Sequence, residues 1–114
     1  MIEVDEETFG VLVERALESI PTELRRQMRN VVVAVEDMGA SPNLLGLYQG
    51  VPLTKRTTTY AGALPDQITI YRLPIIRRCN TLDQVVQQVR VTVVHEVAHH
   101  FGINDARLHE LGWA

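Results

Sequence analysis

The stretch from Thr81 to Gly102 constrains the fold of this chain more than any other part of its sequence. Thr81 and Gln84 have the spacing of a capping box, in which a threonine begins a helix and a glutamine supports its first turn. Gly102 can adopt the left-handed backbone conformation with which many helices end. The sequence therefore predicts one long helix over residues 82–101.

Apolar side chains along this helix indicate that it is buried. They recur at helical spacing as one stripe, and further apolar residues lie on other sides of the last turns. A helix that is apolar nearly all round is expected in a protein core, so we expect His95 and His99 to face an interior cleft instead of bulk solvent. The stripe consists of Leu82, Val85, Val86, Val89, Val93 and Val97.

The last turns of the helix carry the sequence HEVAH, which is an HExxH motif. Residues four apart on a helix lie about 40° apart on one face, so the imidazoles of His95 and His99 can reach one metal ion. Glu96 lies about 100° around the helix from His95, where it can contact a water molecule on the metal without being a ligand. The motif predicts two metal ligands, His95 and His99, and a general base, Glu96.

Beyond the helix, the motif extends to HExxHxxGxxD. A left-handed turn at Gly102 would direct the following residues back towards the histidine pair. Asp105 is therefore the expected third ligand. His109 and Glu110 are the alternatives, because a final short helix would place them within plausible reach of the same ion.

The types of ligand indicate the metal and the reaction. Two imidazoles and one carboxylate, with a fourth position left for water, form a catalytic zinc arrangement, whereas a structural site is more often closed and rich in cysteine. One zinc ion per chain would lower the pKa of a water molecule and polarise a carbonyl group, while Glu96 accepts the proton. The motif therefore predicts hydrolysis of an amide bond.

Some polar residues outside the ligand set are candidates for supporting roles. His100 falls near the apolar stripe, where a hydrogen-bonded histidine is more usual than a ligand. Stabilisation of an oxyanion requires a donor, for which Tyr60, Tyr71 and Arg107 are the candidates. The sequence does not choose among these three.

The rest of the chain alternates between helical and strand patterns. Apolar residues at helical spacing follow Asp5, and the runs VVVAV and QITIY have the β-branched content of strands. The polar connection over residues 50–65 either covers a site or forms a hairpin arm. The expected elements are an amphipathic helix over 5–20, a helical turn over 22–28, a buried strand over 31–35, a second strand over 44–48, a half-buried strand over 67–71 that Pro74 closes, a helical piece over 75–78 and a last helix over 105–111.

Composition excludes several classes of protein. With 46% hydrophobic and 22% charged residues, the 114-residue chain is neither disordered nor fibrous. A net charge of −3 gives no general attraction to phosphate, so we expect no nucleic-acid partner. The single Cys79 excludes an intramolecular disulfide and is expected to be a partly buried structural residue. With no apolar stretch long enough for a bilayer, a cytoplasmic location without membrane contact is expected. The oligomeric state stays open.

The chain resembles the small zincin-like metallopeptidase family, which has a minimal zincin fold. The resemblance is carried by HEVAHHFGINDARLHELGW at 95–113, GLYQGVPLTKR at 46–56 and LPDQITIYRLPI at 64–75. The motif is also similar to that of the metzincins, but Asp105 stands in place of their third histidine and no methionine follows it.

This resemblance implies a single α+β domain over residues 1–114, with a small mixed sheet packed against an N-terminal helix and the long HExxH helix. It implies His95, His99 and Asp105 as zinc ligands, Glu96 as the catalytic base, and a peptide or protein as substrate. It also implies an edge strand that binds extended peptide by β-augmentation. The strands expected over 44–48 and 67–71 are the candidates for that edge.

Two alternative functions follow from the same residues. A bacterial endoribonuclease family that matures ribosomal RNA is similar in an HxxxHxxxxxH pattern, here His95, His99 and Asp105, but Glu96 and the acidic net charge favour peptide hydrolysis. The other alternative is a zinc-stabilised binding module with little catalytic activity. In so short a chain, metal ligation can itself supply much of the folding free energy.

Overall fold

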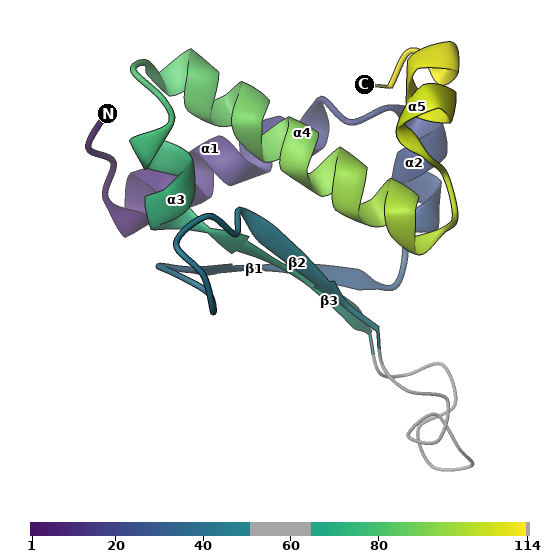
Figure 1. Cartoon of the computed structure of the whole chain (residues 1–114), viewed down its shortest axis with the longest axis horizontal. Coiled ribbons are helices and arrows are strands. Elements are labelled where there is room, and N and C mark those ends of the chain that lie inside the picture. The colour runs from purple at the N-terminus through teal and green to yellow at the C-terminus, as the bar shows by residue number, and fades with distance from the viewer. Residues whose placement is uncertain (51–64, 114) are drawn as a thin grey trace, which may run out of the picture.

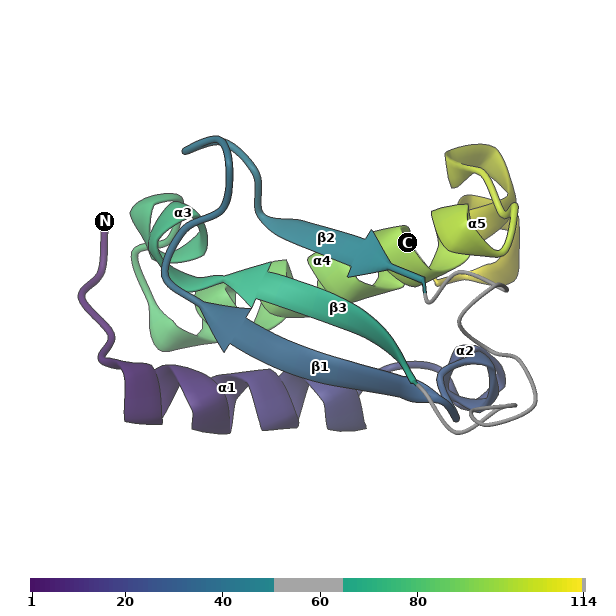
Figure 2. The ribbon, with the colours of Figure 1, turned by 90° about the horizontal axis from the view of Figure 1, so that it is seen from below.

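A three-stranded sheet and the helices packed on it make up the described part of the computed structural model, residues 1–50 and 65–113. Helices α1 and α4 lie across one face of the sheet (Figure 1). Figure 2, turned by 90° from this view, shows the sheet from below, with its strands in front of α4 and with α1 along the β1 side. The expected α+β class is confirmed. In chain order the elements are α1 (Glu6–Glu18), α2 (Thr22–Gln27), β1 (Val31–Glu36), β2 (Gly46–Gln49), β3 (Asp66–Tyr71), α3 (Arg72–Arg77), α4 (Leu82–His100) and α5 (Asp105–Leu111).

Strand β3 lies at the centre of the sheet, whose strand order is β1-β3-β2. It runs parallel to β1 and antiparallel to β2, so the sheet is mixed, as expected. The half-buried character predicted for this strand is wrong, because Ile68 to Tyr71 are all buried. Thr69 is only 2% exposed, because it lies between Ala34 of β1 and Leu47 of β2 in the register.

Strand β1, predicted to be buried, lies instead at an edge of the sheet. None of its residues is buried, and Val32 is 47% exposed. β-branched residues favour a strand because they fit a pleated surface, whatever position that strand takes in its sheet. A run of valines therefore predicted the element correctly but not its environment.

Helix α4 begins at the predicted capping box. The Thr81 hydroxyl accepts a hydrogen bond from the Gln84 N–H at 3.1 Å, and the Gln84 side chain accepts one from the Asn80 N–H at 2.7 Å. The first bond satisfies a backbone donor that the first turn leaves without a helical partner, and the second ties Gln84 to the residue before the N-cap. Four valines of the predicted stripe are fully buried, namely Val85, Val89, Val93 and Val97.

The same helix ends at a Schellman motif around Gly102. Gly102 has a φ of +78°, and the N–H of Ile103 donates to the carbonyl of Ala98 at 2.8 Å. The Gly102 N–H donates to His99 O at 3.1 Å, which completes the motif. The chain reverses here as predicted, and α5 begins at Asp105.

The core fills the space between α1, α4 and the sheet. Its largest fully buried side chains include Phe9 of α1, Leu24 of α2 and Leu108 of α5, so the short helices α2 and α5 also contribute to the core. Trp113 packs partly buried against this core. Cys79 is also buried, and desolvation raises the pKa of its thiol, which makes the thiol a weak nucleophile.

Element boundaries differ most from the prediction around Pro74. This residue does not close a strand; it lies in the first turn of α3, where a helix needs no N–H from it. The last helix, over 105–111, has the predicted bounds. Except at its two ends, the expected connection over residues 50–65 lies outside the described residues, as does Tyr60.

No helix in residues 1–50 or 65–113 combines the length and the apolar character needed to cross a bilayer.

Replacing Ile70 with alanine should lower the free energy of unfolding by about 2–5 kcal/mol, because Ile70 is fully buried in the central strand. Val32→Ala, on the exposed side of β1, should cost less than about 1 kcal/mol. Urea unfolding followed by circular dichroism measures both values. Equal losses for the two variants would contradict the central position of β3.

Candidate functional site

His95 and His99 lie side by side on the last turns of α4. Their ring centroids are 5.9 Å apart and the ring planes are tilted by 37°. The predicted interior cleft is wrong, since His95 is only partly buried and the His99 side chain is 53% exposed. Val94, Val97 and Ala98 fill the core-facing side of these turns, which leaves the histidines on the side nearer solvent.

Asp105 lies directly beside His99. Its Oδ1 is 3.2 Å from His99 Nε2, although the two are separated by the turn at Gly102. Asn104 caps the start of α5 by accepting the Arg107 N–H at 2.9 Å, and this cap holds Asp105 in the first helical position. The reversal predicted from the glycine therefore brings the carboxylate to the histidines.

The two alternative ligands on α5 have other surroundings. Glu110 forms an ion pair with Arg107 at 2.9 Å. Within residues 1–50 and 65–113, no side-chain hydrogen bond or ion pair joins His109 to His95 or His99. Of the three candidate ligands on this helix, Asp105 is the one that contacts His99.

These separations suit a shared zinc ion in part. Donor atoms about 2.0 Å from a tetrahedral zinc ion lie about 3.3 Å apart, close to the distance between His99 Nε2 and Asp105 Oδ1. No group of three or more His, Cys, Asp or Glu side chains in the described residues is arranged to hold a metal ion. The structure thus shows two adjacent pairs that share His99, and not a complete set of three.

Glu96 points towards strand β2. Its Oε1 accepts a hydrogen bond of 3.1 Å from the main-chain N–H of Tyr48. The carboxylate is partly buried, unlike His99, and this one contact joins the predicted general base to the sheet. Sequence reasoning missed Tyr48, because no local spacing relates residue 48 to residue 96.

Tyr48 also connects two further polar residues beside Glu96. Its hydroxyl donates to Asp66 Oδ2 at 2.7 Å, and its ring stacks on His100 with centroids 3.9 Å apart. The expected hydrogen-bonded environment of His100 is wrong. This histidine is exposed, and its Nε2 lies 3.9 Å from Asp66 Oδ2, which is an ion-pair distance and too long for a hydrogen bond.

The candidate oxyanion donors are separated by the fold. Tyr71 is buried at the far end of β3, where its ring lies against Gly39. Arg107 lies two residues after Asp105 and pairs with Glu110. Arg107 is therefore the candidate that lies near the histidines, and Tyr60 is outside the described residues.

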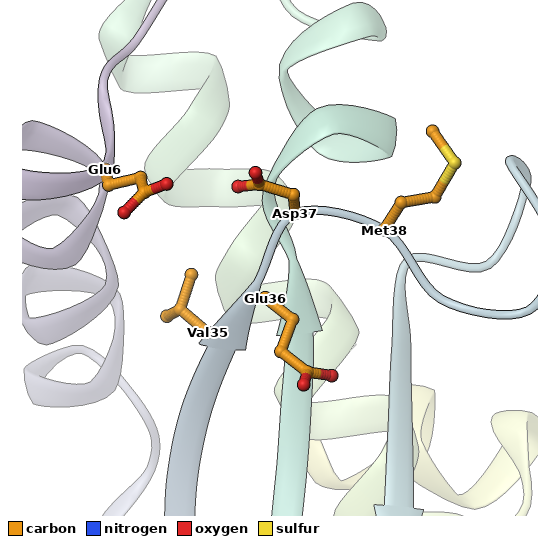
Figure 3. Close-up of a pocket in the computed structure, with 5 residues that line it drawn as sticks. All are labelled: Glu6, Val35, Glu36, Asp37 and Met38. Atoms are coloured by element: carbon orange, nitrogen blue, oxygen red, sulfur yellow. The ribbon is translucent and has the colours of Figure 1, made fainter.

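A hollow of about 680 Å³ lies at the carboxyl end of β1 (Figure 3). In Figure 1 this end of β1 lies at the left, whereas the last turns of α4, which carry the histidines, lie at the right. One of its carboxylates, Asp37, is paired with Arg72 at 2.9 Å. It has no histidine in its lining and is separate from the site on α4. The hollow is lined by Glu6, Val35, Glu36, Asp37 and Met38.

Comparison with known proteins identifies the family. No curated protein matches the sequence. The chain is similar to a solved structure described as a conserved hypothetical protein from Thermus thermophilus, with 25% identity over 85% of this chain and 94% of that chain, and a TM-score of 0.56. A family model for zincin-like metallopeptidases matches residues 28–113, which include β1 to α5. This chain therefore belongs to the zincin-like metallopeptidase family.

Proposed function

We propose that this protein is a zinc metallopeptidase, with His95, His99 and Asp105 as ligands of one zinc ion and Glu96 as general base. The observation that carries the proposal is the placement of Asp105 Oδ1 at 3.2 Å from His99 Nε2, next to the paired rings on α4. Membership of the family supports both the metal and the peptidase chemistry.

Glu96 and Asp105 have different roles in the proposed reaction. When bound, zinc supplies Lewis acidity that activates water and polarises a carbonyl group. Glu96 accepts the proton of the attacking water and returns it to the leaving nitrogen. Its Oε1 is held by the Tyr48 N–H, which leaves the second carboxylate oxygen for proton transfer. Asp105, as the proposed carboxylate ligand, would balance part of the charge of the metal.

The peptide substrate is proposed to bind along the edge of β2 that faces away from β3, where no strand of residues 1–50 or 65–113 pairs with it. The alternative, β3, is a central strand with both neighbours in place. The Tyr71 N–H donates to Leu45 O, so by the alternation of an antiparallel ladder the main-chain groups of Gly46 and Tyr48 point away from β3. Because the Tyr48 N–H donates to Glu96, a peptide on this side would pair with the main-chain groups of Gly46. A peptide added there would lie beside Glu96.

We further propose that the domain spans residues 1–114 and works in the cytoplasm. Helix α1 precedes the matched range of residues 28–113, yet Phe9, Leu12 and Ala16 are buried in the common core. The single buried Cys79 suits a reducing compartment.

Glu96→Gln should keep one zinc ion per chain and lower peptide cleavage by at least about 100-fold, because the amide cannot accept the proton. Mass spectrometry of unfolded polypeptides measures cleavage, and elemental analysis measures zinc. Glu14→Gln, an exposed change on α1, is the matched control and should leave both unchanged. Full activity of Glu96→Gln would contradict the mechanism.

A native protein that binds zinc but cleaves neither peptide nor RNA would favour the alternative function, a zinc-stabilised binding module with little catalytic activity.

Asp105→Ala should weaken zinc affinity strongly, because it removes a proposed ligand. Loss of a residue that only hydrogen-bonds a ligand costs about 10- to 100-fold in affinity, and the loss here should be larger. His109→Ala makes the same kind of change on the same exposed helix and should have little effect. A competitive titration with a chromophoric chelator gives both affinities. The reverse order would identify His109 as the ligand.

Two glycines test whether the reversal of the chain serves zinc binding. Gly102 and Gly112 have φ values of +78° and +74°, and a Cβ at either would meet nothing within 4 Å. Each change to alanine should cost about 1–2 kcal/mol of zinc-free stability, measured by urea unfolding. Zinc affinity should fall only for Gly102→Ala, since only Gly102 lies between His99 and Asp105. Equal effects on zinc would refute this role.

A further inference from the structure

Strand β2 and helix α4 run alongside each other with matching repeats. Two strand residues advance about 6.6 Å and four helix residues about 6 Å, so contacts between them can recur. A Cβ on Gly46 would lie 2.7 Å from Thr92 Cγ2, and a Cβ on Gly50 would lie 3.4 Å from His100 Cε1. Between these two close approaches the Tyr48 N–H meets Glu96.

The close approach at Gly46 depends on the absence of a side chain. A Cβ there would also lie 3.2 Å from the main-chain oxygen of Thr69, which cannot move aside without disturbing the central strand. Any larger residue would push β2 away from α4. The glycine therefore lets the Tyr48 N–H come within 3.1 Å of the Glu96 carboxylate.

Tyr48 is held from two sides. Its hydroxyl donates to Asp66, the first residue of β3, and its ring lies on the imidazole of His100 with only 18° between the planes. One contact comes from the sheet and the other from the helix that carries Glu96. Together they fix the position of the Tyr48 main chain relative to α4.

We propose that Tyr48 is a positioning residue for the general base, and that its contacts with Asp66 and His100 fix the main-chain N–H that orients Glu96. This role rests on the proposed function, because it concerns the proton transfer by Glu96. A glutamate side chain has several rotatable bonds and loses conformational freedom when it takes up one reactive orientation. A fixed hydrogen-bond donor restricts the side chain beforehand, so less freedom is lost during the reaction. Losing that orientation lowers kcat and leaves substrate and zinc binding unchanged.

The kinetic test uses three variants and a matched control. Tyr48→Phe removes the hydroxyl that reaches Asp66, and His100→Ala removes the stacked ring. Each should lower kcat by about 2- to 10-fold, the value of one hydrogen bond, with KM and zinc affinity unchanged. His100→Phe restores an aromatic ring and should restore kcat. Ser19→Ala removes a hydroxyl that donates a hydrogen bond of the same length, 2.7 Å, to Ala16 O at the end of α1, and should leave kcat, KM and zinc affinity unchanged.

A second measurement does not depend on activity. Amide hydrogen exchange by NMR on the full chain should show the Tyr48 N–H protected in the native protein and exchanging faster in Glu96→Ala, which removes the acceptor. The Tyr71 N–H, bonded to Leu45 O at 3.0 Å, should not change and serves as the internal control. Tyr48→Phe and His100→Ala should also speed exchange at residue 48. Thermal unfolding checks that each variant is folded, and the exposed position of His100 favours this.

The outcomes separate the two proposals. If the native protein cleaves peptides and both Tyr48→Phe and His100→Ala retain native kcat, the positioning role is overturned while the peptidase function stands. If the native protein cleaves no peptide, the proposed function fails. The exchange measurement alone then tests whether Tyr48 positions Glu96. Unchanged exchange of the Tyr48 N–H in Glu96→Ala would then overturn the positioning role, and faster exchange would support it.

Discussion

The packing of α4 against the sheet is the interaction on which the rest of this structure depends. Val89, Val93 and Val97 are fully buried in the same core as Ile68 and Ile70 of the central strand. Burial of such side chains contributes about 1.5–3 kcal/mol each, so this contact is a main source of stability. It also sets the position of the last turns of α4, and hence of both histidines and Glu96. Stability and site geometry therefore come from one helix.

The site combines a rigid part with a more exposed part. Glu96 is partly buried and bonded to the sheet through Tyr48, whereas His99 and Asp105 are exposed and meet across a turn. The proposed ligands on the exposed side could adjust on binding a metal, because few neighbours restrict them. The proposed base, by contrast, is held by the Tyr48 N–H of β2. Such a division would couple zinc binding to the docking of α5 while leaving the base in place.

Sequence reasoning succeeded where the physical cause is local. The capping box at Thr81 and the glycine at 102 predicted the limits of α4, since each depends on backbone groups a few residues away. It failed for burial and strand order. The valines of β1 and the alternation in β3 indicate strands, yet only pairing between distant segments decides which strand is central. The exposure of the histidines was misjudged for the same reason, because Val94, Val97 and Ala98 occupy the core side.

The sequence alone determined that one helix carries His95, Glu96 and His99 and that the chain reverses before Asp105. Helical periodicity and a glycine with positive φ operate over a few residues, so their outcome does not depend on the rest of the molecule. Only the tertiary structure decided that β2 is an outer strand of the described sheet and that Tyr48 contacts Glu96, Asp66 and His100. These contacts join segments up to 52 residues apart along the chain, and such pairings arise from packing against a shared core.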